Sequence, residues 1–178
     1  MIIGLDISGT NTGFSIVTDD KTPVEVGYIP LESVSSTIKS LNIFYKTDEI
    51  LRIVTEKLNK YGIKKIIIEA PLDVVTGTNV VSGVILNRLN YSVVYSLYRL
   101  GYEIEYVSSQ HARKLFMGDD YKVWIKLPKG DYKKEYIVEK VEPFINKMIE
   151  FKYRPRAKEK HLAYLYDVCD AYVISIAF

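Results

Sequence analysis

Four carboxylates stand where an ionised side chain is costly. Two of them end short apolar runs, and two interrupt the apolar segment near the end of the sequence: Asp6, Glu69, Asp167 and Asp170. An ionised carboxylate in apolar surroundings is strongly destabilised unless it is paired with a cation or binds a metal. The same segments offer few lysines or arginines that could pair with these acids. Their positions therefore point to a site that uses clustered negative charge.

The spacing of the four acids suggests how they could meet. Asp167 and Asp170 are three residues apart, so a helix would project both from one face. Asp6 and Glu69 would lie side by side if the strands that they end were neighbours. A helix that packed there would bring all four acids together. Repulsion between the carboxylates would raise their pKa values until cations bound to them. Two hard divalent ions bound there would suit phosphodiester hydrolysis. Taken singly, each acid could instead be a turn residue or lie on a solvated helix face.

The rest of the composition restricts the metal. Cys169 is the only cysteine, which excludes an intrachain disulfide and a cysteine zinc cluster, and the two histidines leave little for a histidine site. A bound metal would therefore be held by oxygen, as Mg²⁺, Mn²⁺ and Ca²⁺ are. No basic residue precedes the apolar start, unlike in a signal peptide, and aspartates in the most apolar stretch argue against a membrane span. We expect a cytoplasmic protein that does not contact a membrane.

Hydrophobic patterning predicts one α/β domain over residues 1–178. Short apolar runs bounded by turn residues indicate strands over 1–8, 13–18, 24–30, 63–69 and 102–107. Apolar residues at helical spacing indicate helices over 47–61 (with Thr47 as its N-cap), 79–100, 109–116, 131–150 and 160–176. This order predicts a mixed five-stranded sheet, with three antiparallel strands followed by two parallel ones, flanked by helices.

Basic residues concentrate in one part of the sequence. Residues 111–160 carry a net charge of +6, whereas the other 128 residues carry −4. Within this part, residues 152–160 hold five basic side chains and one acid, directly before the helix that would carry Asp167. We expect phosphate contacts from two groups of side chains: Arg154, Arg156 and Lys158 in this segment, and Lys122 with its basic neighbours up to residue 134. A solvated loop is the ordinary alternative for such a charge run.

Three motifs together resemble RuvC-type Holliday junction resolvases over nearly the whole chain. The opening Met1-Ile-Ile-Gly-Leu-Asp6-Ile-Ser-Gly-Thr-Asn-Thr-Gly13 is similar to the family's first strand, its turn and the start of its second strand. Ile66-Ile-Ile-Glu69 is similar to the strand with the catalytic Glu, and Asp167-Val-Cys-Asp170-Ala-Tyr to the terminal helix. The resemblance implies an RNase H-like fold, a homodimer, and four-way DNA junctions as substrate. It also implies paired nicks that depend on two Mg²⁺ or Mn²⁺ ions and leave 5′-phosphate and 3′-hydroxyl ends.

The resemblance extends to the basic residues less completely. Bacterial members have a catalytic or phosphate-contacting lysine after the fifth strand, where this chain has Arg113 with Lys114 beside it. A second lysine of the family, which would neutralise transition-state charge, corresponds to Lys133 or Lys134. Arg113 keeps the charge but does not deprotonate readily, and Leu72 stands where bacterial members have an aromatic residue that stacks at the junction. These departures suit a phage or mobile-element member better than a bacterial housekeeping enzyme.

A stripe of tyrosines follows one side of the helix expected over 79–100: Tyr91, Tyr95, Tyr98 and Tyr102. A lone aromatic stripe more often packs in a core. The resemblance implies instead that this helix forms the dimer interface, where tyrosine is favoured.

Two other functions compete with a nuclease. The turn after Asp6 also suits an actin-like ATPase, in which such a turn holds phosphates and Mg²⁺, but 178 residues leave room for only one of the two domains that this class needs. The second alternative is a non-catalytic binder of branched nucleic acid or a relative that works on RNA. Four intact carboxylates argue against an inactive binder and do not separate DNA from RNA.

Overall fold

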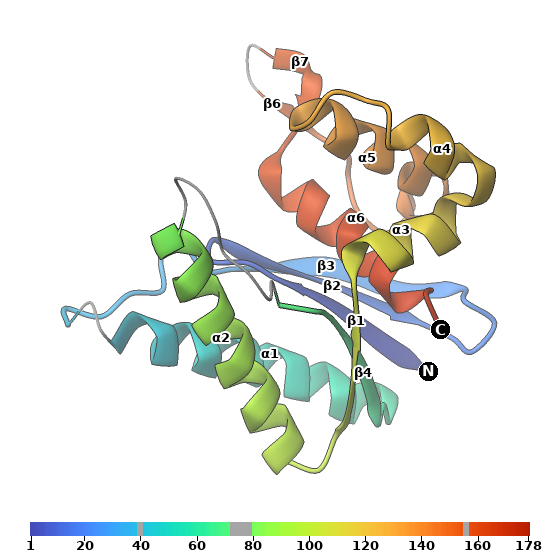
Figure 1. Ribbon diagram of the computed structural model, residues 1–178. Coiled ribbons are helices and arrows are strands. Elements are labelled where there is room, and N and C mark those ends of the chain that lie inside the picture. Colours follow the sequence, from blue (N-terminus) through green and yellow to red (C-terminus); the bar gives the residue numbers. More distant parts are fainter. Residues whose placement is uncertain (39–40, 72–79, 155–156) are drawn as a thin grey trace.

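A mixed five-stranded sheet forms the centre of the computed structural model, which describes residues 1–38, 41–71, 80–154 and 157–178 (Figure 1). The strands are β1 (Ile2–Ile7), β2 (Asn11–Val17), β3 (Pro23–Pro30), β4 (Lys65–Glu69) and β5 (Glu103–Val107). Their order is β3-β2-β1-β4-β5. The three strands of β3-β2-β1 are antiparallel, and β1, β4 and β5 run parallel to one another. The sheet predicted from the sequence is confirmed.

Helices cover both faces of this sheet (Figure 1). One face carries α1 (Asn42–Tyr61) and α2 (Val80–Arg99), and the other carries α3 (Ser109–Met117), α5 (Asp131–Ile145) and α6 (Ala163–Ser175). Successive side chains of a strand point to opposite faces, so Ile66 and Ile68 pack in the core beneath α1 and α2 while Ile67 packs beneath α6. Among the described residues, no helix is both long and apolar enough to cross a membrane.

The predicted start of one helix and the predicted end of another are wrong. The helix expected over 47–61 begins at Asn42, and Thr47 lies inside it, buried, with its hydroxyl donating to the carbonyl oxygen of Ile43 at 2.8 Å. A threonine at this position satisfies its hydroxyl against the preceding turn, so Thr47 is not the N-cap. The helix expected over 131–150 ends at Ile145. The polar segment 118–130 contains a 3₁₀ turn (Gly118–Asp120) and the short helix α4 (Tyr121–Trp124).

A β-hairpin replaces the loop and helix start expected over 152–162. Strands β6 (Tyr153–Arg154) and β7 (Ala157–His161) pair antiparallel, and α6 begins only at Ala163. The backbone N–H of His161 donates to the carboxylate of Glu135 on α5 at 2.8 Å, and the His161 ring contacts the same carboxylate at 2.5 Å. These contacts fix the end of β7 in an extended conformation. A local pattern does not reveal a partner 26 residues away.

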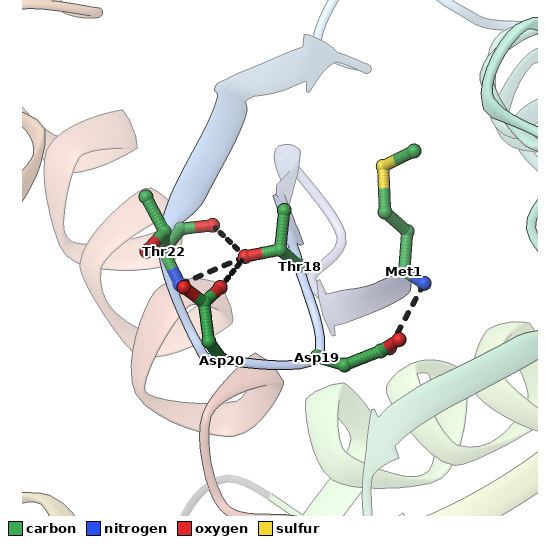
Figure 2. A network of polar contacts seen from close by, with 5 residues as sticks. All are labelled: Met1, Thr18, Asp19, Asp20 and Thr22. Carbon is green, nitrogen blue, oxygen red and sulfur yellow. Dashed lines mark hydrogen bonds and ion pairs between the residues drawn. The ribbon is translucent and has the colours of Figure 1, made fainter.

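Local bonds close the end of the sheet opposite Asp6 (Figure 2). In the turn between β2 and β3, the hydroxyl of Thr18 accepts a hydrogen bond from the backbone N–H of Thr22 at 3.1 Å and contacts the carboxylate of Asp20. The terminal ammonium of Met1 pairs with Asp19 at 3.0 Å, and exposed pairs of this kind are worth at most about 1 kcal/mol. The polar residues at this end of the sheet bond to one another and close the turn. Asp6 and Glu69 lie toward the opposite ends of their strands.

Candidate active site

Two glycines allow α6 to lie directly on the sheet. A Cβ at Gly13 would lie 2.0 Å from the carbonyl oxygen of Asp167, and one at Gly4 would lie 2.5 Å from that of Ala171. Side chains at these positions would push the helix away, which is why the close approach requires glycine. The contact sets the height of α6 over β1 and β2 and thereby positions Asp167 and Asp170.

Asp6 and Glu69 meet because their strands are neighbours. β1 and β4 run parallel, and Leu5 of β1 lies opposite Ile68 of β4. Asp6 and Glu69 follow these two residues, so both acids lie at the carboxyl ends of their strands. Beyond the effect of burial, the charges of Glu69, Asp170 and Asp167 all act on Asp6 and raise its pKa. The structure thus brings the four predicted acids together.

Three of these acids have raised pKa values. Burial is the largest cause at Asp6, whose pKa lies well above its ordinary value, and the neighbouring carboxylates raise it further. Burial and then the charge of Asp170 raise the pKa of Glu69, and the same two causes raise the pKa of Asp167 to about 7. Near neutral pH the cluster therefore retains protons, and a cation that bound there would displace them.

Arg113 binds the fourth acid. Its guanidinium donates to Asp170 through Nη2 at 2.8 and 2.9 Å and through Nε at 3.2 Å, and both side chains are largely buried. Such a forked contact is a strong, directional form of the arginine–carboxylate pair. The arginine that was expected to contact DNA is thus engaged, in this structure, with the carboxylate cluster. Its carbon Cζ also lies 5.5 Å from the centre of the Trp124 ring.

The two candidate lysines differ in their surroundings. Lys134 is exposed, its charge lowers the pKa of Asp167, and its ammonium lies 5.1 Å from the centre of the Tyr166 ring. Lys133 donates instead to the carbonyl oxygen of Ile125 at 3.1 Å. Both line a pocket of about 240 Å³ beside the acids, together with Arg113, Trp124, Gly130, Ile137, Tyr166 and Asp170. Lys134 is therefore the better placed of the two to act beside Asp167.

Of the other predicted DNA-binding residues, two are exposed helix residues, and the rest lie where the structure describes no side chain. Lys114 is exposed on α3, and Lys122 is exposed and pairs with Asp119 at 3.0 Å. Arg154 and Lys158 lie within β6 and β7, where only the backbone is described. Leu72 and Arg156 lie outside the described residues.

Sequence patterns missed several polar neighbours of the acids. A hydrogen bond from Asn11 lowers the pKa of Asp167, and one from Ser109 lowers that of Glu69. Ser108 caps α3 by accepting from the backbone N–H of His111 at 3.2 Å, which places Ser109 at the first turn. Asn and Ser are common in turns and at helix starts, so neither carried a signal of its own.

The residues of this site are suitable ligands for a divalent cation, but in this structure their side chains are not arranged around one ion. All four candidate ligands are carboxylates, the ligand type that Mg²⁺ and Mn²⁺ prefer. Within the described residues, however, no three acidic, histidine or cysteine side chains are placed as ligands of one ion. Arg113 holds Asp170 in an ion pair of 2.8 Å. The guanidinium of Arg113 balances part of the cluster's negative charge here, and a bound metal would compete with it for Asp170.

Three solved structures that share this architecture are Holliday junction resolvases. No protein-family model and no curated protein matches the sequence. RuvC from T. thermophilus in complex with a Holliday junction substrate matches 99% of this chain and 90% of its own, with a TM-score of 0.62 and 12% identity. Another Thermus thermophilus RuvC structure gives 0.59 at 12% identity over 99% and 91% of the two chains. The yeast mitochondrial Holliday junction resolvase gives 0.58 at 12% identity over 99% and 77%. The chain therefore has the RuvC-type, RNase H-like fold.

Proposed function

We propose that the protein is a metal-dependent endonuclease that cleaves branched DNA, such as four-way junctions, by paired nicks. The observation that carries this proposal is the meeting of Asp6, Glu69, Asp167 and Asp170 at one end of an RNase H-like sheet. Two divalent ions held by these carboxylates would supply an activated water and charge stabilisation for phosphodiester hydrolysis. The products would carry 5′-phosphate and 3′-hydroxyl ends.

The surrounding side chains would position the acids and the phosphate. Asn11 and Ser109, whose side chains lower the pKa values of Asp167 and Glu69, would orient these two acids. Lys134, beside Asp167, is placed to neutralise charge that develops on the scissile phosphate. Arg113 keeps Asp170 directed into the cluster and adds a fixed positive charge.

One assay tests the proposal directly. The protein is incubated with a labelled four-way junction, with and without Mg²⁺ or Mn²⁺, and the strands are resolved on a denaturing gel. We expect symmetric nicks only with the metal, and little cleavage of a linear duplex of the same sequence. Equal cleavage of both substrates would contradict structure selectivity, and no cleavage of either would contradict a nuclease.

The exposed side of α2 predicts a homodimer. Val81, Tyr91, Tyr95 and Tyr98 are 73, 55, 60 and 67% exposed, whereas Tyr102 packs against the core beneath α1 and α2. A contiguous apolar and aromatic surface of this kind is typical of a protein interface, and a twofold dimer would present one site to each of two equivalent strands. Light scattering should give about 41 kDa, twice the 20.5 kDa of the chain. A monomer at micromolar concentration with junction bound would contradict this prediction.

Neutralising the basic segment should weaken binding without changing the acids. In the triple variant Arg154→Ala, Arg156→Ala and Lys158→Ala, affinity should fall alike for every junction sequence, because phosphate contacts do not read bases. The slope of log affinity against log salt should become shallower by roughly 0.9 for each phosphate that the variant no longer neutralises. A salt series of junction binding measures both quantities. A control triple on exposed residues elsewhere should change neither: Lys21, Arg52 and Lys60.

A further inference from the structure

A stacked pair of tyrosines lies beside the carboxylates at the open edge of the sheet. Tyr28 of β3 and Tyr164 of α6 have ring centres 4.3 Å apart and an angle of 15° between the rings. β3 is one of the two edge strands of the sheet, and Tyr28 is 38% exposed. The pair therefore combines a rigid aromatic surface with access to solvent.

Strand register places this pair on the same face as the acids. Asp6 of β1 lies opposite Gly13 of β2, which lies opposite Tyr28 of β3. Residues directly opposite in antiparallel strands share a face, and two strand spacings separate Asp6 from Tyr28 by roughly 10 Å. Tyr164 precedes Asp167 by three residues on α6, so both project from one side of that helix.

A positive charge adjoins the rings. The backbone carbonyl of Lys152 accepts from the N–H of Leu162, two residues before Tyr164, at 2.9 Å, and, against the effect of burial, the charge of Lys152 lowers the pKa of Tyr164. Lys152 also pairs with Glu150 at 2.9 Å, but both side chains are more than half exposed, so the pair is weak and open to exchange for a phosphate. An aromatic surface next to a cation is the combination that holds unpaired nucleotides: bases stack on the rings and the backbone contacts the charge.

We propose that Tyr28 and Tyr164 form a stacking platform for a nucleobase that is unpaired at the branch point of the bound DNA. The proposal rests on the proposed function, since it assumes that a DNA strand passes the carboxylates. The platform holds the displaced base beside the site while the strand backbone crosses the acids. It is tolerant of sequence, because every base has a face that stacks.

The platform can be tested without cleavage. A junction carrying 2-aminopurine at an unpaired branch position is titrated with protein in EDTA, since stacking quenches the fluorescence of this base. Wild type and Tyr28→Phe should both quench it, because both keep the ring. Tyr28→Leu should lose the quenching and bind the junction about tenfold more weakly, with little change for a fully paired duplex. Tyr45→Leu is the matched control, since Tyr45 is 50% exposed on α1, which covers the other face of the sheet.

Several outcomes would overturn the platform. Full quenching by Tyr28→Leu would do so, and so would an equal loss of affinity for the junction and the duplex. If Tyr28→Leu fails to fold, Tyr28→Trp decides, because its larger ring should bind the junction more tightly than wild type does. If wild type cleaves junctions but its quenching does not depend on Tyr28, the stacking platform is contradicted and the nuclease proposal stands. If wild type quenches the fluorescence but never cleaves the junction, the nuclease proposal is contradicted and the stacking platform stands.

Discussion

Replacing Asp6 by Asn or Glu69 by Gln is expected to reduce junction cleavage by more than roughly 100-fold. Loss of a residue that only orients a metal ligand already costs about 10- to 100-fold, and these substitutions remove proposed ligands themselves. The same result is expected for Asp167→Asn and Asp170→Asn. Cleavage under single-turnover conditions with saturating protein measures the effect.

Junction binding should survive all four substitutions. Affinity for DNA comes mainly from basic contacts to phosphates, and each amide keeps the shape of the acid while removing a negative charge that repels the DNA. Binding in EDTA should therefore be unchanged or tighter. Asp119→Asn is the matched control, because Asp119 is 97% exposed and forms its ion pair with the exposed Lys122; it should cleave like wild type. Full nicking by the Asp6 or Glu69 variant would end the metal-site proposal.

The sheet and its carboxylates could be predicted because their signals are local. Glu69 follows three isoleucines that fill both faces of β4, and Asp6 follows the apolar run Ile2-Ile3-Gly4-Leu5 of β1. Strand ends of parallel neighbours meet at one edge, so the meeting of the two acids needed only the strand order. The i, i+3 spacing of Asp167 and Asp170 supplied the rest, since it holds for any helix.

The partners of these acids could not be predicted because they are distant in sequence. Arg113 reaches Asp170 across 57 residues, and nothing in the local pattern of α3 indicates that its guanidinium turns inward. The β6–β7 hairpin likewise depends on a contact of His161 with Glu135. The stack of Tyr28 on Tyr164 joins the edge strand β3 to a helix 136 positions later. Each follows from the docking of α6, which the sequence shows only through the glycines that permit it.

The raised pKa of Asp167 predicts that the protein loses stability as the pH rises. Burial and the charge of Asp170 raise its pKa from 3.8 to about 7 in the folded protein. A raised folded-state pKa contributes stability that is complete below pH 4 and is lost as the pH rises through 7. In EDTA, the free energy of unfolding of wild type should therefore fall between pH 5 and pH 8, by about 2 kcal/mol. Urea unfolding across this range measures the fall.

Asp167→Asn should reduce this dependence, because an amide has no proton to lose, while Asp6 and Glu69, whose pKa values are also raised, keep part of it. At pH 8 the metal-free variant should be the more stable protein, whereas at pH 5 the two should differ little. Glu25 does not interfere, because hydrogen bonds from Lys57 and Tyr61 outweigh its burial and lower its pKa to about 2, well below this pH range. Mg²⁺ should restore stability to wild type at pH 8 more than at pH 5, since a cation binds the deprotonated acids, and should help the variant less. Parallel pH profiles of the two proteins would show that Asp167 is ionised at neutral pH and that the cluster does not hold its proton there.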